Sequence, residues 1–309
     1  MLLSLKDCRI GTVALNLVIF RLFTHFPALL SAPPFIALLS GTIALVIIFI
    51  LFKLAEKLPD GSITQCTPPL WGIMVTIAAA LYVSFNLIYA LDQASRLIKQ
   101  ISFPSSPLWY ISLFLVTGAL VGAFSKKAFS RLHNLFVPGI ITVVILMIAA
   151  TLIGGKFIFP SPFRTENISS SVMNILKGLL IYSDVFLLLF LPIQKADRRK
   201  LTKTAVLSSA IGLALNCAFI FAFAVMTPDY LIGSGEFPVF LLMKQVYIGR
   251  FFQRMDALVI MACAYSAMLY GCFNLIILTN TLGSRIKIFG SRLFLVICAL
   301  AVFVVTFIP

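Results

Sequence analysis

Charged residues are scarce in this 309-residue chain. They make up 11% of the sequence, against 61% hydrophobic residues, and only ten of them are acidic. A water-soluble domain carries about 25% charged residues, because its surface must be hydrated. The composition therefore excludes a soluble globular fold. Apolar runs of about 20 residues recur along the chain, and each is long enough to cross the hydrocarbon core of a bilayer as a helix.

The residues and motifs of common catalytic and metal sites are also scarce. The chain has two histidines, and its six cysteines form no CxxC pair. Neither a zinc site nor a disulfide framework is indicated. The sequence contains no Walker loop, no HExxH, no GxSxG and no dinucleotide fingerprint. We therefore expect no enzyme activity, no metal and no cofactor.

Nine apolar segments are predicted to span the membrane as helices. They cover residues 10–30, 34–52, 69–91, 107–124, 134–154, 172–193, 204–226, 256–279 and 293–309. If the N-terminus is cytoplasmic, fifteen Lys and Arg residues fall on the cytoplasmic side and seven on the outer side. Short cytoplasmic loops collect basic residues, so this orientation is favoured. The net charge of +14 then reflects membrane topology, and no nucleic acid is expected as a partner.

Asp184 lies near the middle of the sixth segment, and the basic run "KADRRK" follows that segment as a cytoplasmic stop. An ionised side chain at the bilayer centre costs about 2.5–3.5 kcal/mol on insertion scales. Two interpretations remain open: a ligand for an ammonium, a cation or a proton, and a charge paired with a neighbouring helix for packing. Ser183 precedes it as a further candidate. Lys177 lies roughly 10 Å away on the same face, where it either joins the site or extends to the outer surface.

The first segment is interrupted in a similar way by Asn16 and Arg21. Interrupted segments at corresponding positions of two halves indicate a site near the membrane midplane in transporters built from inverted repeats. Arg21 is therefore a candidate ligand, and pairing with Asp92 or Asp256 is the alternative. A cleaved secretory signal over residues 1–32 is disfavoured, because Arg21 interrupts its apolar core.

Gly178 and Pro192 permit a broken helix in the sixth segment. Amide and hydroxyl side chains also gather in two other segments, where Asn86 and Tyr265 are the site candidates. Such groups are as often hydrogen-bonding contacts between helices as ligands, so both interpretations stay open. The full set is Tyr82, Ser84 and Asn86 in the third segment, and Tyr265, Ser266 and Asn274 in the eighth. The passage "GALVG" at 118–122 predicts a close helix packing face without a chemical role.

Four passages resemble the B subunits of spore germinant receptors, the endospore germination permeases of the amino acid/polyamine/organocation transporter superfamily. They are "RIGTVALNLVIF" at 9–20, "FKLAEKLPDGSITQ" at 52–65, "GLLIYSDVFLLLFLPIQK" at 178–195 and "VYIGRFFQRMDAL" at 246–258. The resemblance implies an all-α polytopic membrane protein with a LeuT-like inverted-repeat bundle. It is a single integral membrane permease-like domain over 1–309, with a first repeat at about 8–154 and a second at about 171–309. The family usually has ten spans and nine are counted here, so the second repeat is expected to lack the tenth helix.

The resemblance also implies a function. A nutrient germinant, commonly an amino acid, would bind between the first, third, sixth and eighth spans, with a larger A subunit and a lipoprotein C subunit as partners in the spore inner membrane. In such a site Arg21 favours the carboxylate of a zwitterion and Asp184 favours its ammonium. Two alternatives remain: an ion-coupled amino acid transporter acting alone, and a structural membrane subunit without a ligand.

Overall fold

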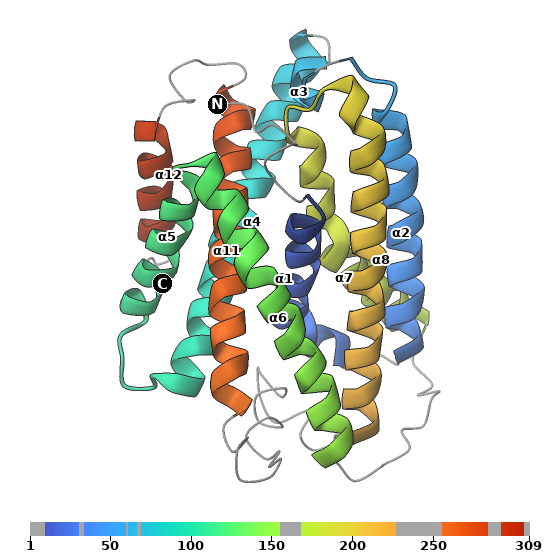
Figure 1. Ribbon diagram of the computed structural model, residues 1–309, viewed down its shortest axis with the longest axis vertical. Helices are drawn as coiled ribbons and strands as arrows, with labels where there is room; N and C mark the ends of the chain where they lie inside the picture. The colour runs from blue at the N-terminus through green and yellow to red at the C-terminus, as the bar shows by residue number, and fades with distance from the viewer. Residues whose placement is uncertain are drawn as a thin grey trace.

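The protein is a bundle of long helices, shown in Figure 1 as a computed structural model. The structure describes residues 10–30, 34–59, 61–66, 69–154, 168–226, 255–283 and 292–305. Within these ranges the regular elements are helices, and no β-strand is formed. The elements are α1 (Ile10–Leu30), α2 (Pro34–Ala55), α3 (Ile63–Cys66), α4 (Pro69–Ser102), α5 (Leu108–Ala123), α6 (Lys126–Gly154), α7 (Ile168–Ser183), the 3₁₀ helix η1 (Asp184–Phe190), α8 (Lys195–Met226), α11 (Met255–Gly283) and α12 (Arg292–Val305).

The predicted all-α membrane fold is confirmed. In the described part of the chain, six helices are long and apolar enough to cross a membrane, and three shorter apolar helices lie in α1, α5 and α12. Each of the nine predicted segments coincides with one of these helices. The chain is therefore a multi-pass membrane protein. The inverted-repeat relation between its two halves stays a prediction.

Several helices extend further than their apolar segments. α4 continues past the predicted end at 91 to Ser102, α6 begins at Lys126 instead of 134, and α8 begins at Lys195 instead of 204. These extensions contain polar residues that favour or tolerate a helix, including Asp92 and Arg96, which form an i,i+4 ion pair at 2.8 Å. Hydropathy marks where a helix leaves the hydrocarbon, not where its hydrogen bonding ends.

Two helices form the centre of the bundle. In Figure 1, α1 lies between α11 and α8, with α2 at one edge and α5 and α12 at the other. Every side chain of α1 from Val13 to Thr24 is buried, and α11 is buried over most of its length. The outer helices expose large apolar side chains such as Phe35 and Ile50 of α2. This pattern is expected for a bundle whose surface faces lipid tails.

Glycines allow the helices to approach closely. A Cβ atom built at Gly118 of α5 would lie 2.7 Å from the Sδ atom of Met268, and one at Gly122 would lie 2.9 Å from the Sγ atom of Cys272. The predicted packing face at 118–122 is therefore confirmed, and its partner is α11. A Cβ at Gly212 of α8 would similarly meet Val18 at 2.7 Å.

The sixth span changes from an α-helix to a 3₁₀ helix at Asp184 and becomes extended at Leu191, in keeping with the broken helix that Gly178 and Pro192 permit. α7 ends at Ser183, η1 continues for two turns, and Leu191 is extended with ψ of 137°. Proline disfavours a helical conformation for the residue before it, so Pro192 accounts for the extended Leu191. The predicted interruption of the first span is wrong, because α1 is one continuous helix through Arg21. The Asn16 and Arg21 side chains find partners on other helices and do not require an unwound backbone.

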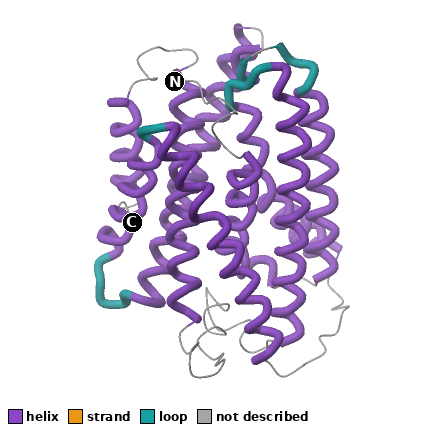
Figure 2. The backbone as a smooth tube through the Cα atoms, in the orientation of Figure 1, coloured by secondary structure: helices purple, strands orange, loops and turns teal. Residues whose placement is uncertain are grey.

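A clasp between the α2–α3 loop and the η1–α8 connection fixes the far end of η1. Gly61 and Ile193 form an isolated antiparallel bridge between the loop at 56–62 and the loop at 191–194, and these two loops meet at one end of the bundle in Figure 2. The buried Arg198 of α8 donates hydrogen bonds to the carbonyl oxygens of Ala55, Pro59 and Gly61 at 3.2, 2.6 and 2.8 Å. Gly61 has a φ of 119°, which favours glycine there.

Candidate functional site

Side chains from four elements meet around Asp184. Arg21 of α1 forms a two-pronged ion pair with this carboxylate: its Nε donates to Oδ2, and its Nη2 donates to Oδ1 at 3.0 Å. The Arg21 side chain is 3% exposed and that of Asp184 is 0% exposed. Both charges therefore lie inside the bundle, near the middle of their membrane-spanning segments. We call Arg21, Asp184, Tyr82 and Tyr270 the charged cluster.

Tyr270 of α11 connects the two charges. Its hydroxyl accepts a hydrogen bond from Arg21 Nη2 at 3.0 Å and donates one to Asp184 Oδ2 at 2.8 Å. Its ring is fully buried and packs on Phe20, with ring centroids 4.5 Å apart. Hydrogen bonds to charged groups are stronger than neutral ones and satisfy the charges in a low-dielectric interior. Tyr270 is therefore the residue that hydrogen-bonds both charges of the cluster.

Tyr82 of α4 forms the accessible edge of the cluster. Its hydroxyl lies 3.1 Å from Asp184 Oδ1 and 2.8 Å from Ser183 Oγ. Ser183 Oγ also lies within donating distance of the Leu180 carbonyl oxygen, at 2.7 Å. The Tyr82 hydroxyl has one proton, so it can donate to Asp184 or to Ser183 but not to both at once. Its hydrogen bond can therefore alternate between these two acceptors. Tyr82 is 36% exposed, whereas the other cluster members are buried. Tyr82 is therefore the cluster member that reaches the surface of the bundle.

The structure decides the partner of Arg21. Pairing with Asp92 is wrong, because Asp92 lies on the α4 extension and binds Arg96. The side chain of Asp256 lies outside the described residues. The pairing of Arg21 with Asp184 joins two residues that the sequence predicts as separate ligands for the two ends of a zwitterion.

Of the other predicted site residues, Asn16 binds a different partner and Asn86 lies beside Tyr82. Asn16 of α1 and Ser266 of α11 bind each other: the Asn16 Nδ2 donates to the Ser266 carbonyl at 3.3 Å, and Ser266 Oγ donates to Asn16 Oδ1 at 2.8 Å. Asn86 lies one turn from Tyr82 on α4 and is buried, and its Nδ2 has no hydrogen-bond partner in the described part of the structure. Asn86 therefore stays a candidate ligand beside the cluster.

Lys177 and Tyr265 are not brought to Asp184. Lys177 is exposed on α7, two turns before the break. Tyr265 stacks on Phe136 of α6, with ring centroids 4.4 Å apart and planes at 14°. It faces an apolar pocket on the other side of α11. Site roles for these two residues stay predictions, and the structure gives them no contact with the charged cluster.

Tyr270 is missing from the sequence-based candidates, although a signal for it exists. It lies four residues after Ser266 and four before Asn274, so the three residues form one polar stripe on α11. Reading the eighth segment at helical spacing finds this stripe.

Among the described residues, no three His, Cys, Asp or Glu side chains lie close enough together to hold a metal ion.

A family model described as "Spore germination protein" matches residues 35–309. The match contains Asp184, Tyr82 and Tyr270, whereas Arg21 precedes it. It also contains three of the four passages that resemble the germination permeases, including residues 246–258, most of which lie outside the described part of the structure. None of the curated proteins compared with the chain matches it.

Proposed function

This chain belongs to the spore germination protein family, and on that premise we propose that it is the membrane-embedded subunit of a germinant receptor that recognises an amino acid. The family and the apolar helices make the chain a germination-related membrane permease. Recognition of an amino acid goes beyond what the family match gives. The observation that supports it is the buried ion pair between Arg21 and Asp184.

A zwitterion is the ligand that this ion pair suits best. Separating two buried charges without replacing them costs about 3–5 kcal/mol, because each is left without a counter-charge. An amino acid carries both replacements: its carboxylate binds Arg21 while its ammonium binds Asp184. A ligand with one charge satisfies only one of the two residues. The pair therefore favours free amino acids over amines or carboxylic acids of the same size.

The break at Asp184 supports a change between two packings of the bundle. In the structure the carboxylate binds Arg21, Tyr82 and Tyr270. Asp184 is the first residue of η1, so its backbone is not held in the middle of an α-helix. A ligand that binds the separated pair more tightly than the joined pair would shift the population toward a packing in which Arg21 and Asp184 are apart.

The proposal also includes partners and a location. We place the chain in the spore inner membrane with its N-terminus in the cytoplasm, beside a larger A subunit and a lipoprotein C subunit. The cytoplasmic orientation is supported by the basic residues around the α7–α8 connection, and Arg198 there is buried in the clasp with the α2–α3 loop. A shift at Asp184 would reach this clasp through the two turns of η1.

The experiment is a germination dose response with spores that carry Asp184→Asn. This change keeps the shape and removes the charge that binds the ammonium. Asp92→Asn is the matched control, because it removes a carboxylate from an exposed ion pair on α4. We expect Asp184→Asn to abolish or re-tune the nutrient response while the protein still inserts and assembles, and Asp92→Asn to respond as the parent. An unchanged dose response for Asp184→Asn contradicts the proposal.

An ion-coupled amino acid transporter acting alone is the second candidate. It is favoured by the same break at a buried charge, which is typical of transporters that bind substrate at the membrane midplane. Uptake of labelled amino acid into proteoliposomes that contain only this chain, collapsed by an ionophore, would establish transport. Binding without uptake would favour the receptor subunit.

A further inference from the structure

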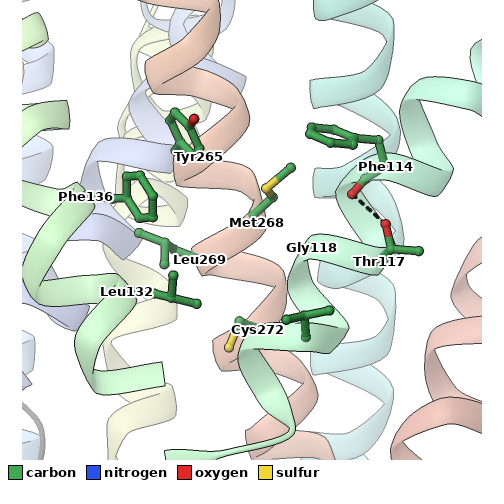
Figure 3. Close-up of a pocket in the computed structure, with 10 residues that line it drawn as sticks. Phe114, Thr117, Gly118, Leu132, Phe136, Tyr265, Met268, Leu269 and Cys272 are labelled. Atoms are coloured by element: carbon green, nitrogen blue, oxygen red, sulfur yellow. Dashed lines mark hydrogen bonds between the residues drawn. The ribbon is translucent and has the colours of Figure 1, made fainter. Parts of the chain in front are cut away.

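An apolar pocket lies on the opposite face of α11 from the charged cluster. It has a volume of about 350 Å³ and is lined by α5, α6 and α11. Figure 3 shows Leu132 and Phe136 of α6 facing Phe114 and Thr117 of α5, with Met268 of α11 between them. The volume falls in the range of small-ligand pockets. The full lining is Phe114, Thr117, Gly118, Val121, Leu132, Phe136, Tyr265, Met268, Leu269 and Cys272.

The lining offers very little to a polar ligand. It contains two hydroxyl groups, and that of Thr117 already donates within its own helix, to the carbonyl oxygens of Leu113 at 2.8 Å and Phe114 at 3.0 Å. The other belongs to Tyr265. A buried water needs two to four polar partners, which this pocket does not supply. Its occupant is therefore apolar.

The mouth of the pocket is continuous with the surface that faces lipid. Phe114 and Val121 of α5 are 63% and 64% exposed. They lie on α5, an apolar helix of this multi-pass membrane protein, so we expect hydrocarbon at the mouth. An acyl chain can enter from there without crossing water.

A helix of another protein would fit poorly at the mouth of this pocket. Close approach of two membrane helices needs small residues on the facing surface. The small residues of α5, Gly118 and Gly122, face α11 and already accommodate Met268 and Cys272. The residues that point outward, Phe114 and Val121, are bulky. A single flexible chain can pass between them, whereas a helix about 10 Å wide cannot.

We propose that this pocket binds one acyl chain of a bilayer lipid. An empty apolar cavity loses dispersion contacts along its whole lining, and an acyl chain restores them. Met268 lies between the α5 and α6 side chains of the pocket, and its unbranched thioether adapts to occupants of different shape. None of the lining residues belongs to the charged cluster, so the site stands whether or not the chain recognises amino acids.

Photo-crosslinking tests this site in the full-length protein. The protein is reconstituted in nanodiscs of phosphatidylcholine that carries a diazirine in one acyl chain, irradiated, and analysed by peptide mass spectrometry. We expect Met268 and Leu269 to be labelled several-fold more than Phe35 and Leu70, which are exposed apolar residues outside the pocket. Leu269 itself is buried, so a chain must enter the pocket to reach it.

Two threonine variants serve as a matched pair. Thr117→Phe narrows the pocket, and Thr42→Phe makes the same change on the exposed face of α2, where Thr42 also donates to its own helix at 2.7 Å. Thr117→Phe is expected to lower labelling of Met268 and Leu269 several-fold, and Thr42→Phe to leave it unchanged. Val121→Trp, at the mouth, provides a second block should Thr117→Phe unfold.

Several outcomes overturn the proposal. Labelling of Leu269 at or below that of Phe35 means that no acyl chain enters. Labelling that persists in folded Thr117→Phe and Val121→Trp proteins means that the label arrives by another route. A crosslink from Met268 to another protein in native membranes, in place of lipid, assigns the pocket to a partner subunit.

Discussion

The two faces of α11 differ in chemical character: one makes polar contacts and the other lines an apolar pocket. Ser266 and Tyr270 face α1, where each finds a hydrogen-bond partner, and Tyr270 binds both charges of the cluster. Tyr265 and Met268 face the apolar pocket between α5 and α6. We therefore propose that a charged ligand is recognised through polar contacts on the α1 face, and that the pocket on the other face selects its occupant by shape and apolar character. Changes on the α1 face are expected to have the larger effects.

The largest effect is expected from Asp184→Asn. It leaves the buried Arg21 without its counter-charge, which costs about 3–5 kcal/mol. Adding Arg21→Gln removes the remaining charge, so the double variant is expected to regain most of the lost stability without regaining ligand binding. Thermal unfolding in detergent measures both. If the double variant is as unstable as Asp184→Asn alone, the two charges are not coupled.

Tyr270→Phe tests the polar face of α11 directly. It removes the hydroxyl that binds both charges, and a hydrogen bond to a charged group contributes about 1.5–3 kcal/mol. Tyr265→Phe makes the same change on the apolar face and keeps the stacking on Phe136. We expect a fall in unfolding temperature for Tyr270→Phe and little change for Tyr265→Phe. Equal falls in unfolding temperature for the two variants would contradict the distinction between the polar and apolar faces of α11.

Gly271→Ala tests the packing that holds α11 in place. A Cβ there would lie 2.9 Å from the Cβ of Ala119 on α5, which has no flexible end to move aside. Overpacking of this kind costs about 1–3 kcal/mol. Gly139→Ala on α6 is the control, because a Cβ there meets nothing within 4 Å. Removing a mid-helix glycine stabilises by about 0.5–1 kcal/mol, so the two variants should shift the unfolding temperature in opposite directions.

The smallest effect is expected from Lys177→Gln. Lys177 is exposed, and the structure gives it no contact with the charged cluster. Substitutions of this kind usually change stability by about 0.5 kcal/mol or less. The measurement is amino acid affinity of the purified protein. A large loss of affinity would place Lys177 in the ligand-bound site and favour the first of its two sequence interpretations.

Much of the fold can be predicted from the sequence, because span length is a property of consecutive residues. Nine apolar runs identify nine apolar helices among the described residues, and Gly178 and Pro192 permit a break in the sixth span without placing it. The ends of α4 and α8 cannot be placed this way, since their polar extensions remain helical outside the hydrocarbon.

The site is predicted less completely, because contacts between spans depend on how each helix is rotated. The charges of Arg21 and Asp184 stand out in apolar runs, but their pairing with each other requires α1 and η1 to be in place. Tyr265 and Tyr270 look equivalent in the sequence. The structure places the first against Phe136 and the second between the charges. The pocket of three helices has no signal in any single segment.

The most direct test of the central claim compares ligands that carry both charges with ligands that carry one. The purified protein is screened against the common amino acids by thermal shift, and the strongest binder is then compared with its methyl ester and its N-acetyl derivative. Because each derivative leaves one buried charge without a partner, at a cost of about 3–5 kcal/mol, we predict affinities on the order of 100-fold weaker or more. A methyl ester or N-acetyl derivative that binds as tightly as the free amino acid would contradict recognition by the pair of Arg21 and Asp184.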